Sequence, residues 1–192
     1  MKETIAILIE KIKYEVDLIE EYIRSGEYNG AEFDEPGSFQ IAISNEEVEE
    51  KTQKLWGRKG IYIFLTTSEF DFPQDKIIQW NSCSGALINS QDSVNGNMVS
   101  FSIEKDQIFY IGSCYSESLL TRIRQHCNNT NSTQTASLKM GDKHREWVKE
   151  YLEVYYFPIK KKYTENELHI IIAGIEKELH NRYETIAGSS RT

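Results

Sequence analysis

The spacing of hydrophobic residues predicts a long amphipathic helix at the start of the chain. Between residues 3 and 26, apolar side chains recur every three or four positions with Glu and Lys between them, which places them on one face of a helix. These residues are Ile5, Leu8, Ile9, Ile12, Val16, Ile19 and Ile23. Ser25 and Gly26 end the pattern. Two interpretations stay open: the stripe packs on the core, or it contacts a partner or a second copy.

A loop and a shorter helix are expected next. Residues 27–45 contain a Pro and several Gly, and within them 39–43 is expected as a short strand. A helix is expected from Asn45 to about Trp56, because Asn favours the N-cap and acidic residues fill the first turn.

Two runs of β-forming residues, 60–65 and 108–112, predict buried strands. Between them, residues 85–88 and 98–103 have the pattern of a hairpin around an Asn-Gly turn at 95–96. We expect this insertion, at about 67–106, to extend the sheet. A second role stays open, because loops on a rigid scaffold often recognise the substrate.

The remaining elements alternate helices with one strand. They are a helix at 117–127, a polar loop at 128–135, a helix at 138–151, a strand at 153–157 and a helix at 164–182. The last helix has a clear start, because Thr164 and Glu167 have the spacing of a capping box. The order from residue 60 is β, insertion, β, α, α, β, α. It predicts the α/β (α+β) class, with a small, mainly antiparallel sheet flanked by helices.

The negative charge is confined to one part of the chain. Of the 192 residues, 39% are hydrophobic and 27% charged, and the net charge is −8. Residues 1–55 contain 14 acidic and 6 basic side chains, whereas residues 56–192 contain 16 of each. We therefore expect an acidic helical extension at 1–56 and a nearly neutral domain at 57–192. The charge disfavours tight non-specific binding to nucleic acid but permits a local basic patch.

Several classes of protein are excluded or disfavoured. No apolar run approaches the ~20 residues that span a membrane, and the N-terminus lacks the features of a signal peptide, so we expect no membrane association and a cytoplasmic location. Three cysteines without pairwise spacing favour reduced thiols. The sequence has no Walker-type loop, nucleophile elbow or dinucleotide-binding fingerprint.

Polar residues with catalytic chemistry recur on successive predicted elements. Tyr62 and Tyr110 lie in the strand strings Gly-Ile-Tyr and Tyr-Ile-Gly. Arg122 and His126 are four residues apart and share one face of a helix. The last helix contains Glu176, preceded by an apolar run. Each residue alone has an ordinary structural interpretation, as a strand tyrosine or a solvated helix charge. Their order on separate elements indicates a site.

This order resembles the GIY-YIG endonuclease family, over a core from about residue 60 to residue 191. The resemblance implies the GIY-YIG fold and a metal-dependent endonuclease that hydrolyses phosphodiester bonds in DNA, with Mg²⁺ or Mn²⁺ as cofactor. The size of the chain and its insertion are more similar to a restriction-type nuclease than to a fragment of a repair enzyme. A homodimer fits double-strand cleavage, because one active site cuts one strand at a time.

The resemblance also implies roles for the five residues. Glu176 holds the single divalent metal, and Arg122 contacts the scissile phosphate. Tyr62 and Tyr110 line the site, and one of them helps to activate water, which requires cations that lower the pKa of its phenol. His126 orients a tyrosine or assists proton transfer. Glu178 lies about 200° from Glu176 around the helix, so only one of the two can face the site.

The sequence departs from the family in two places. The 47 residues at 63–109 form a much longer spacer between the two tyrosine motifs than the family has. The Pro and Asn that usually follow the metal-binding Glu are missing from residues 183–191, where Ser189, Ser190 or Arg191 can substitute. These departures and the acidic balance leave a second function open, a catalytically inactive nucleic-acid-binding or protein-interaction module with the same fold.

Overall fold

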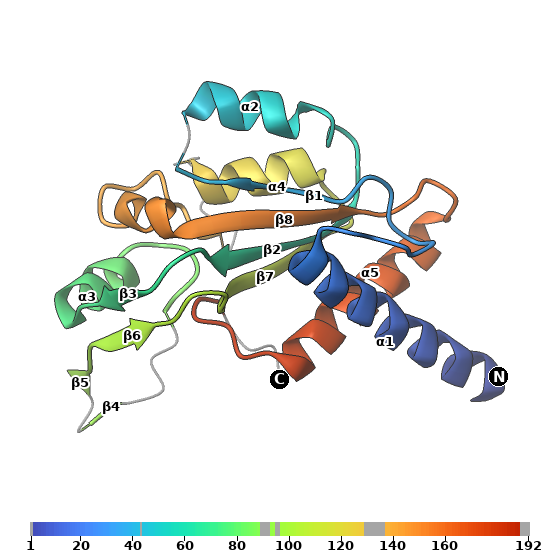
Figure 1. The fold of residues 1–192 in the computed structure, drawn as a ribbon, viewed down its shortest axis with the longest axis horizontal. Coiled ribbons are helices and arrows are strands. Elements are labelled where there is room, and N and C mark those ends of the chain that lie inside the picture. The colour runs from blue at the N-terminus through green and yellow to red at the C-terminus, as the bar shows by residue number, and fades with distance from the viewer. Residues whose placement is uncertain (1, 43, 89–92, 95–96, 129–136, 189–192) are drawn as a thin grey trace.

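The computed structural model describes residues 2–42, 44–88, 93–94, 97–128 and 137–188. Its centre is a four-stranded antiparallel sheet in the order β1-β8-β2-β7 (Figure 1). The strands are β1 (Gly37–Gln40), β2 (Gly60–Thr66), β7 (Ile108–Cys114) and β8 (Leu152–Pro158). The chain is therefore a mixed α/β protein with a small antiparallel sheet, as the sequence predicts.

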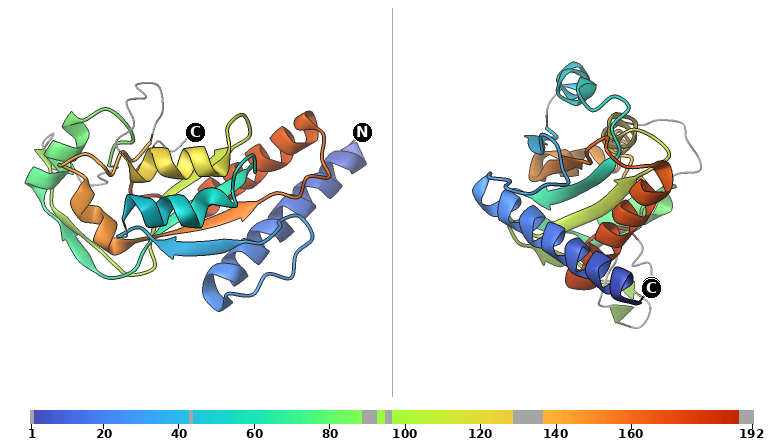
Figure 2. Two further views of the ribbon diagram at one scale, coloured as in Figure 1. Left: turned by 90° about the horizontal axis from the view of Figure 1, so that it is seen from above. Right: turned by 90° about the vertical axis from the view of Figure 1, so that its right-hand side faces the viewer.

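Alternating side chains on the strands separate two hydrophobic clusters. On one face of β2, Tyr62 and Phe64 pack with α4 (Leu119–Cys127). On the other face, Ile61 and Ile63 pack with α1 (Lys2–Ser25) and α5 (Glu165–Arg182). Figure 2 shows α1 and α5 together on one side of the sheet and α4 on the other. Helix α2 (Asn45–Gln53) packs against α4 on the side away from the sheet (Figure 1).

The acidic N-terminal segment is built into this fold. Its strand β1 is an edge strand of the central sheet and pairs with β8. In α1, Val16 and Ile19 are fully buried, whereas Ile7 is 64% exposed. The core-packing interpretation therefore applies to the second half of the helix. The N-cap of α2 is Ser44, which forms a capping box with Glu47, so the expectation that Asn45 caps this helix was wrong.

The insertion does not extend the central sheet, so the expectation that residues 85–88 and 98–103 form a hairpin added to that sheet was wrong. Strand β6 (Phe101–Ile103) pairs with β3 (Phe70–Phe72) in a separate two-stranded sheet, and Ile88 bridges Ala187 near the C-terminus. Between them the chain forms α3 (Gln74–Ser82), which was not predicted. Its N-cap is Pro73, a residue whose fixed φ suits the start of a helix. Residues 95–96, the expected turn, lie outside the described residues, although the short strands β4 (Ser93–Val94) and β5 (Asn97–Met98) pair on either side of them.

The helix expected at 138–151 is mostly absent. Only its end is helical, as the short 3₁₀ helix η1 (Glu146–Tyr151). The amides of Leu138 and Met140 instead donate to His126, and Lys139 has a left-handed φ of 49°. These amides bond to α4 rather than to a helix of their own, and the positive φ interrupts helical geometry.

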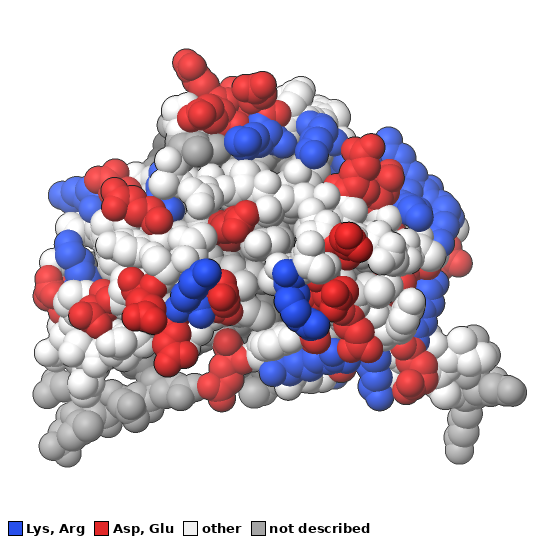
Figure 3. Space-filling view, viewed as in Figure 1, with Lys and Arg blue, Asp and Glu red and all other residues white. Residues whose placement is uncertain are grey.

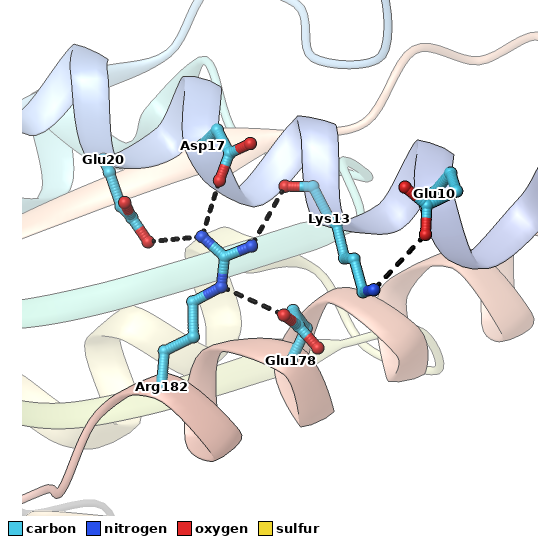
Figure 4. A network of polar contacts seen from close by, with 6 residues as sticks. All are labelled: Glu10, Lys13, Asp17, Glu20, Glu178 and Arg182. Carbon is cyan, nitrogen blue, oxygen red and sulfur yellow. Dashed lines mark hydrogen bonds and ion pairs between the residues drawn. The ribbon is translucent and has the colours of Figure 1, made fainter.

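Helix α5 begins and ends where the sequence predicts. Thr164 caps it and forms the capping box with Glu167. At its other end, Arg182 donates to Asp17, Glu20 and Glu178 and to the carbonyl of Lys13, which ties α5 to α1 (Figure 4). Among the described residues, no helix is both long and apolar enough to cross a membrane.

Candidate active site

A cavity of about 260 Å³ lies at the β7 edge of the sheet, and four of the five predicted site residues line it. Tyr62 reaches it from β2, Tyr110 from β7, Arg122 from α4 and Glu176 from α5. The fifth, His126, lies behind Tyr62 and is fully buried. The structure thus brings together side chains that are up to 114 positions apart in the sequence (62 to 176).

The two tyrosines are held side by side by the pairing of β2 with β7. Tyr62 lies opposite Gly112, and its ring stacks on that of Tyr110 with centroids 6.3 Å apart and planes 18° apart. A Cβ on Gly112 would lie 2.4 Å from the Tyr62 ring. The glycine of the second motif therefore makes room for the tyrosine of the first.

His126 has a defined tautomer. Its Nδ1 accepts a hydrogen bond from the amide of Leu138 at 2.9 Å, and its Nε2 lies 3.0 Å from the hydroxyl of Tyr62. Burial, reinforced by the positive charge of Arg122, holds the pKa of His126 well below its usual value of 6.5, so the ring is neutral at pH 7. A neutral imidazole has one N–H. Because Nδ1 accepts, Nε2 carries the proton and donates to Tyr62.

Tyr62 keeps its own proton at neutral pH. Burial raises its pKa well above 10, Tyr110 adds to this shift, and Arg122 opposes it. The hydroxyl oxygen receives hydrogen bonds from His126 and from Arg122. These contacts orient the phenol. The lowered pKa that a tyrosine base requires is not found for Tyr62 with these neighbours.

Arg122 lies at the wall of the cavity on the first turns of α4. This helix begins at Ser118, whose side chain accepts a hydrogen bond from the amide of Thr121. The Arg122 guanidinium donates to Gln125 at 2.8 Å in addition to Tyr62. Its remaining N–H groups suit a phosphate oxygen, since a guanidinium donates along two parallel directions.

Glu176 reaches the cavity from the opposite layer of the protein. Helix α5 covers the other face of the sheet, but β7 is an edge strand, and Glu176 accepts a hydrogen bond of 2.7 Å from Ser113 at that edge. Its neighbour Glu178 faces α1 instead and bonds Arg182 at 3.0 Å (Figure 4). The two carboxylates therefore have separate environments, as their angular separation predicts.

The cavity also contains residues that the sequence reasoning did not identify. These are Gly112, Ser113, Cys114, Tyr115, Ser116 and Glu117. Ser113 follows the Tyr-Ile-Gly string directly, so its position beside the motif was the available signal. Burial raises the pKa of the Cys114 thiol to about 12, which keeps it protonated and disfavours a nucleophilic role. The Leu138 amide, which sets the tautomer of His126, has no signal in the sequence.

The donor set of the cavity fits a single hard cation. Glu176 offers a second carboxylate oxygen beyond the one that accepts from Ser113, and Mg²⁺ is commonly held by one or two carboxylates while it keeps several waters. In the described part of the chain, no group of three or more His, Cys, Asp or Glu side chains forms a multi-residue metal centre. Ser189, Ser190 and Arg191, the expected substitutes for the family's terminal residues, lie outside the described residues.

A second hollow of about 220 Å³ adjoins the cavity and is basic. It shares Tyr115 with the first and is also lined by Arg58, Lys59 and Lys161, with Glu165 as its acidic residue. Lys59 donates to the carbonyls of residues 116 and 117 in the loop after β7. In Figure 3, Lys and Arg gather at the right-hand edge, where Figure 1 shows the turn between β8 and α5.

Comparison of the chain with models of protein families, with curated proteins and with solved structures finds no match.

Proposed function

We propose that this chain is a metal-dependent nuclease of the GIY-YIG type that hydrolyses phosphodiester bonds in DNA. One observation carries the proposal: Tyr62, Tyr110, Arg122 and Glu176 come from four separate elements and line one cavity. The sequence resemblance selected the same residues from their order alone. The assignment to a restriction-type enzyme is an analogy at the level of the fold.

In this proposal the side chains of the cavity have different roles in the hydrolysis of a phosphodiester. Arg122 contacts a non-bridging phosphate oxygen and stabilises the negative charge that grows in the transition state. Tyr62, held by His126 and Arg122, donates its O–H to the phosphate or to the attacking water. Tyr110 packs against Tyr62 and restricts its ring.

Glu176 is the residue that would hold a divalent cation at the mouth of the cavity, with Ser113 fixing one of its two oxygens. A bound Mg²⁺ or Mn²⁺ supplies Lewis-acid stabilisation of the phosphate and lowers the pKa of a coordinated water. The orientation of the carboxylate by a hydroxyl is the kind of supporting contact that metal ligands usually have.

The basic hollow beside the cavity supports a nucleic acid as substrate. Arg58, Lys59 and Lys161 line this hollow, which shares Tyr115 with the cavity, so a neighbouring phosphate of the same strand can lie there. The alternative is an inactive module that binds nucleic acid or protein with the same fold. The acidic balance of residues 1–55 favours that alternative.

The test is cleavage by the purified protein. Supercoiled plasmid, single-stranded DNA and RNA are each incubated with the chain in Mg²⁺ or Mn²⁺, and a parallel reaction contains EDTA. We expect nicked or linear plasmid that forms only with the metal. Binding without cleavage under every metal condition supports the inactive module, and neither binding nor cleavage contradicts the proposal.

A further inference from the structure

Arg145 is buried in the protein, and among the described residues it forms no ion pair. Its side chain is fully inaccessible, and in the described part of the chain no carboxylate lies within ion-pair distance of it. Burial lowers the pKa of its guanidinium, whereas Cys83 and Asp142 act in the opposite direction and raise it. A buried charge is costly unless hydrogen bonds satisfy it. The hydrogen bonds that the buried Arg145 forms therefore matter, as do the segments that they connect.

The guanidinium bonds backbone carbonyls from two separate segments. Its Nη1 donates to Leu138 at 2.9 Å, and its Nη2 donates to Trp80 at 2.6 Å and to Cys83 at 3.1 Å. It also lies over the Trp80 ring, 4.6 Å from the centroid. Trp80 and Cys83 are at the end of α3, so Arg145 joins the insertion to the segment before η1.

A second contact brings the insertion against the same segment. Gly85 has a φ of 128°, and a Cβ there would lie 2.5 Å from the carbonyl of Ser137 and 2.8 Å from Arg145. The next amide, of Ala86, donates to that Ser137 carbonyl at 2.9 Å. The backbone around Leu138 is thus held from both sides.

The held segment is the one that sets the tautomer of His126. The Leu138 amide donates to Nδ1 of His126, and the Met140 amide donates to the His126 carbonyl at 2.8 Å. Arg145 thus binds the carbonyl of Leu138, and the amide of the same residue, which belongs to the preceding peptide group, bonds His126 beside the Tyr62 hydroxyl. Buried polar contacts of this kind help to specify one arrangement, although the Nε of Arg145 has no hydrogen-bond partner among the described residues.

We propose that Arg145 is a positioning residue for the candidate active site: by holding the Leu138 carbonyl, it fixes the residue whose amide keeps Nδ1 of His126 an acceptor and makes Nε2 the donor to Tyr62. The insertion is then a support for the site, since α3 provides two of the three carbonyls that bind Arg145. The catalytic meaning of this contact rests on the proposed nuclease function, but the tautomer itself does not.

The experiment is nitrogen NMR of the ¹⁵N-labelled full chain, without substrate. In the wild type we expect His126 with a proton on Nε2 and a coupling across the hydrogen bond from the Leu138 amide to Nδ1. In Arg145→Met we expect this coupling to be lost and the ratio of the two tautomers to fall about fivefold, which corresponds to about 1 kcal/mol. Ile19→Ala, which opens a cavity in the cluster on the other face of the sheet, is the control for lowered stability and should change neither signal.

Two further variants keep the test decisive. If Arg145→Met does not fold, Arg145→Lys retains the charge but cannot bind three carbonyls in the same fork, and Gly85→Ala presses on the same contact with Arg145 in place. Both should weaken the coupling. A wild-type His126 protonated on Nδ1, or an unchanged coupling in the folded variants, overturns the proposal.

Cleavage gives a separate readout. If the wild type cleaves DNA, Arg145→Met should lower kcat with little change in KM, and the double variant with His126→Ala should lose no more than His126→Ala alone. Full additivity contradicts the proposal. If the wild type does not cleave, the nuclease function fails, and the NMR result still decides the role of Arg145.

Discussion

At the scale of single residues, the position of Tyr62 depends on Gly112 and His126. Its ring fills the space that a side chain at Gly112 would need, and its hydroxyl is fixed by His126. The ring is fully buried, so it has little freedom to move aside. A methyl group at residue 112 must therefore displace the tyrosine or the strand.

Gly112→Ala is predicted to destabilise the protein and disturb the site together. Overpacking of a buried position usually lowers the free energy of unfolding by about 1–3 kcal/mol. The control is Gly174→Ala, where the added Cβ would also lie 2.4 Å from a neighbour, but that neighbour is the movable end of Ile12. Alanine is also preferred in a helix. Urea unfolding of both variants checks the prediction, and equal losses would contradict it.

The buried, neutral His126 predicts acid sensitivity. Its folded pKa lies well below the ordinary value of 6.5, so below pH 6.5 the unfolded chain binds a proton that the folded chain does not. Stability attributable to His126 is therefore full above pH 6.5 and falls as the pH drops towards its folded pKa, by up to about 1.4 kcal/mol per pH unit.

The measurement for His126 is the free energy of unfolding between pH 7.5 and 5 for the wild type and His126→Gln. The wild type should lose stability more steeply than the variant, because the variant lacks the titrating ring. Parallel curves would show that His126 binds a proton equally in both states.

At the scale of elements, α1 holds the C-terminal end of α5, the helix that contains Glu176. Arg182 contacts three carboxylates, two of them on α1, and it is only 26% exposed (Figure 4). Without the guanidinium, Asp17, Glu20 and Glu178 would repel one another. Networks of this kind contribute more than isolated surface pairs.

Arg182→Met is predicted to lower the free energy of unfolding by about 1–2 kcal/mol, since each exposed pair contributes about 0.2–1 kcal/mol. The control, Arg24→Met, removes a single exposed pair with Glu21 and should have almost no effect. The difference should shrink in 1 M salt, which screens exposed charges. An Arg182→Met variant as stable as Arg24→Met at low salt would contradict this account.

The same elements show what a sequence can and cannot specify. The long α1, the two core strands and α5 were predicted because their periodicity and the capping box of Thr164 are local signals. The structure of the insertion was not predicted. Strand β6 pairs with β3 rather than with residues 85–88, and which partner it takes depends on packing between distant parts of the chain. The 138–151 region failed for the same reason, since its amides bond to His126.

The candidate site was predictable to a different degree. The order of tyrosines, arginine, histidine and glutamate gave its residues, and the separation of Glu176 from Glu178 followed from helix geometry. That α5 reaches the cavity around an edge strand follows from the strand order, which local patterns do not encode. The same holds for the Leu138 amide and for Arg145.

At the scale of the whole molecule, the charge is distributed so that basic residues gather beside the cavity despite a net charge of −8. Lys161 lines the basic hollow, on the turn after β8. Lys143, in the segment before η1, is also an exposed lysine but does not line the hollow. The two positions form a matched pair for testing where nucleic acid binds.

Lys161→Ala is predicted to weaken DNA binding and to reduce the slope of log K against log salt by about 1, the effect of losing one phosphate contact. Lys143→Ala should leave the slope unchanged. Titrations at several salt concentrations, with a DNA duplex labelled by a fluorophore, measure both. Equal effects of the two variants would mean that binding is general electrostatic attraction without a site.

In the proposed function, the Glu176 carboxylate and the cavity it lines hydrolyse phosphodiester bonds with a divalent metal. The most direct measurement is plasmid cleavage in Mg²⁺ by Glu176→Gln beside Glu178→Gln, with DNA binding followed in parallel. Both changes remove one negative charge from α5 and keep the shape, but only Glu176 lines the cavity, while Glu178 bonds Arg182. We predict that Glu176→Gln binds DNA and does not cleave it, and that Glu178→Gln cleaves like the wild type. Cleavage at the wild-type rate by Glu176→Gln would contradict the claim.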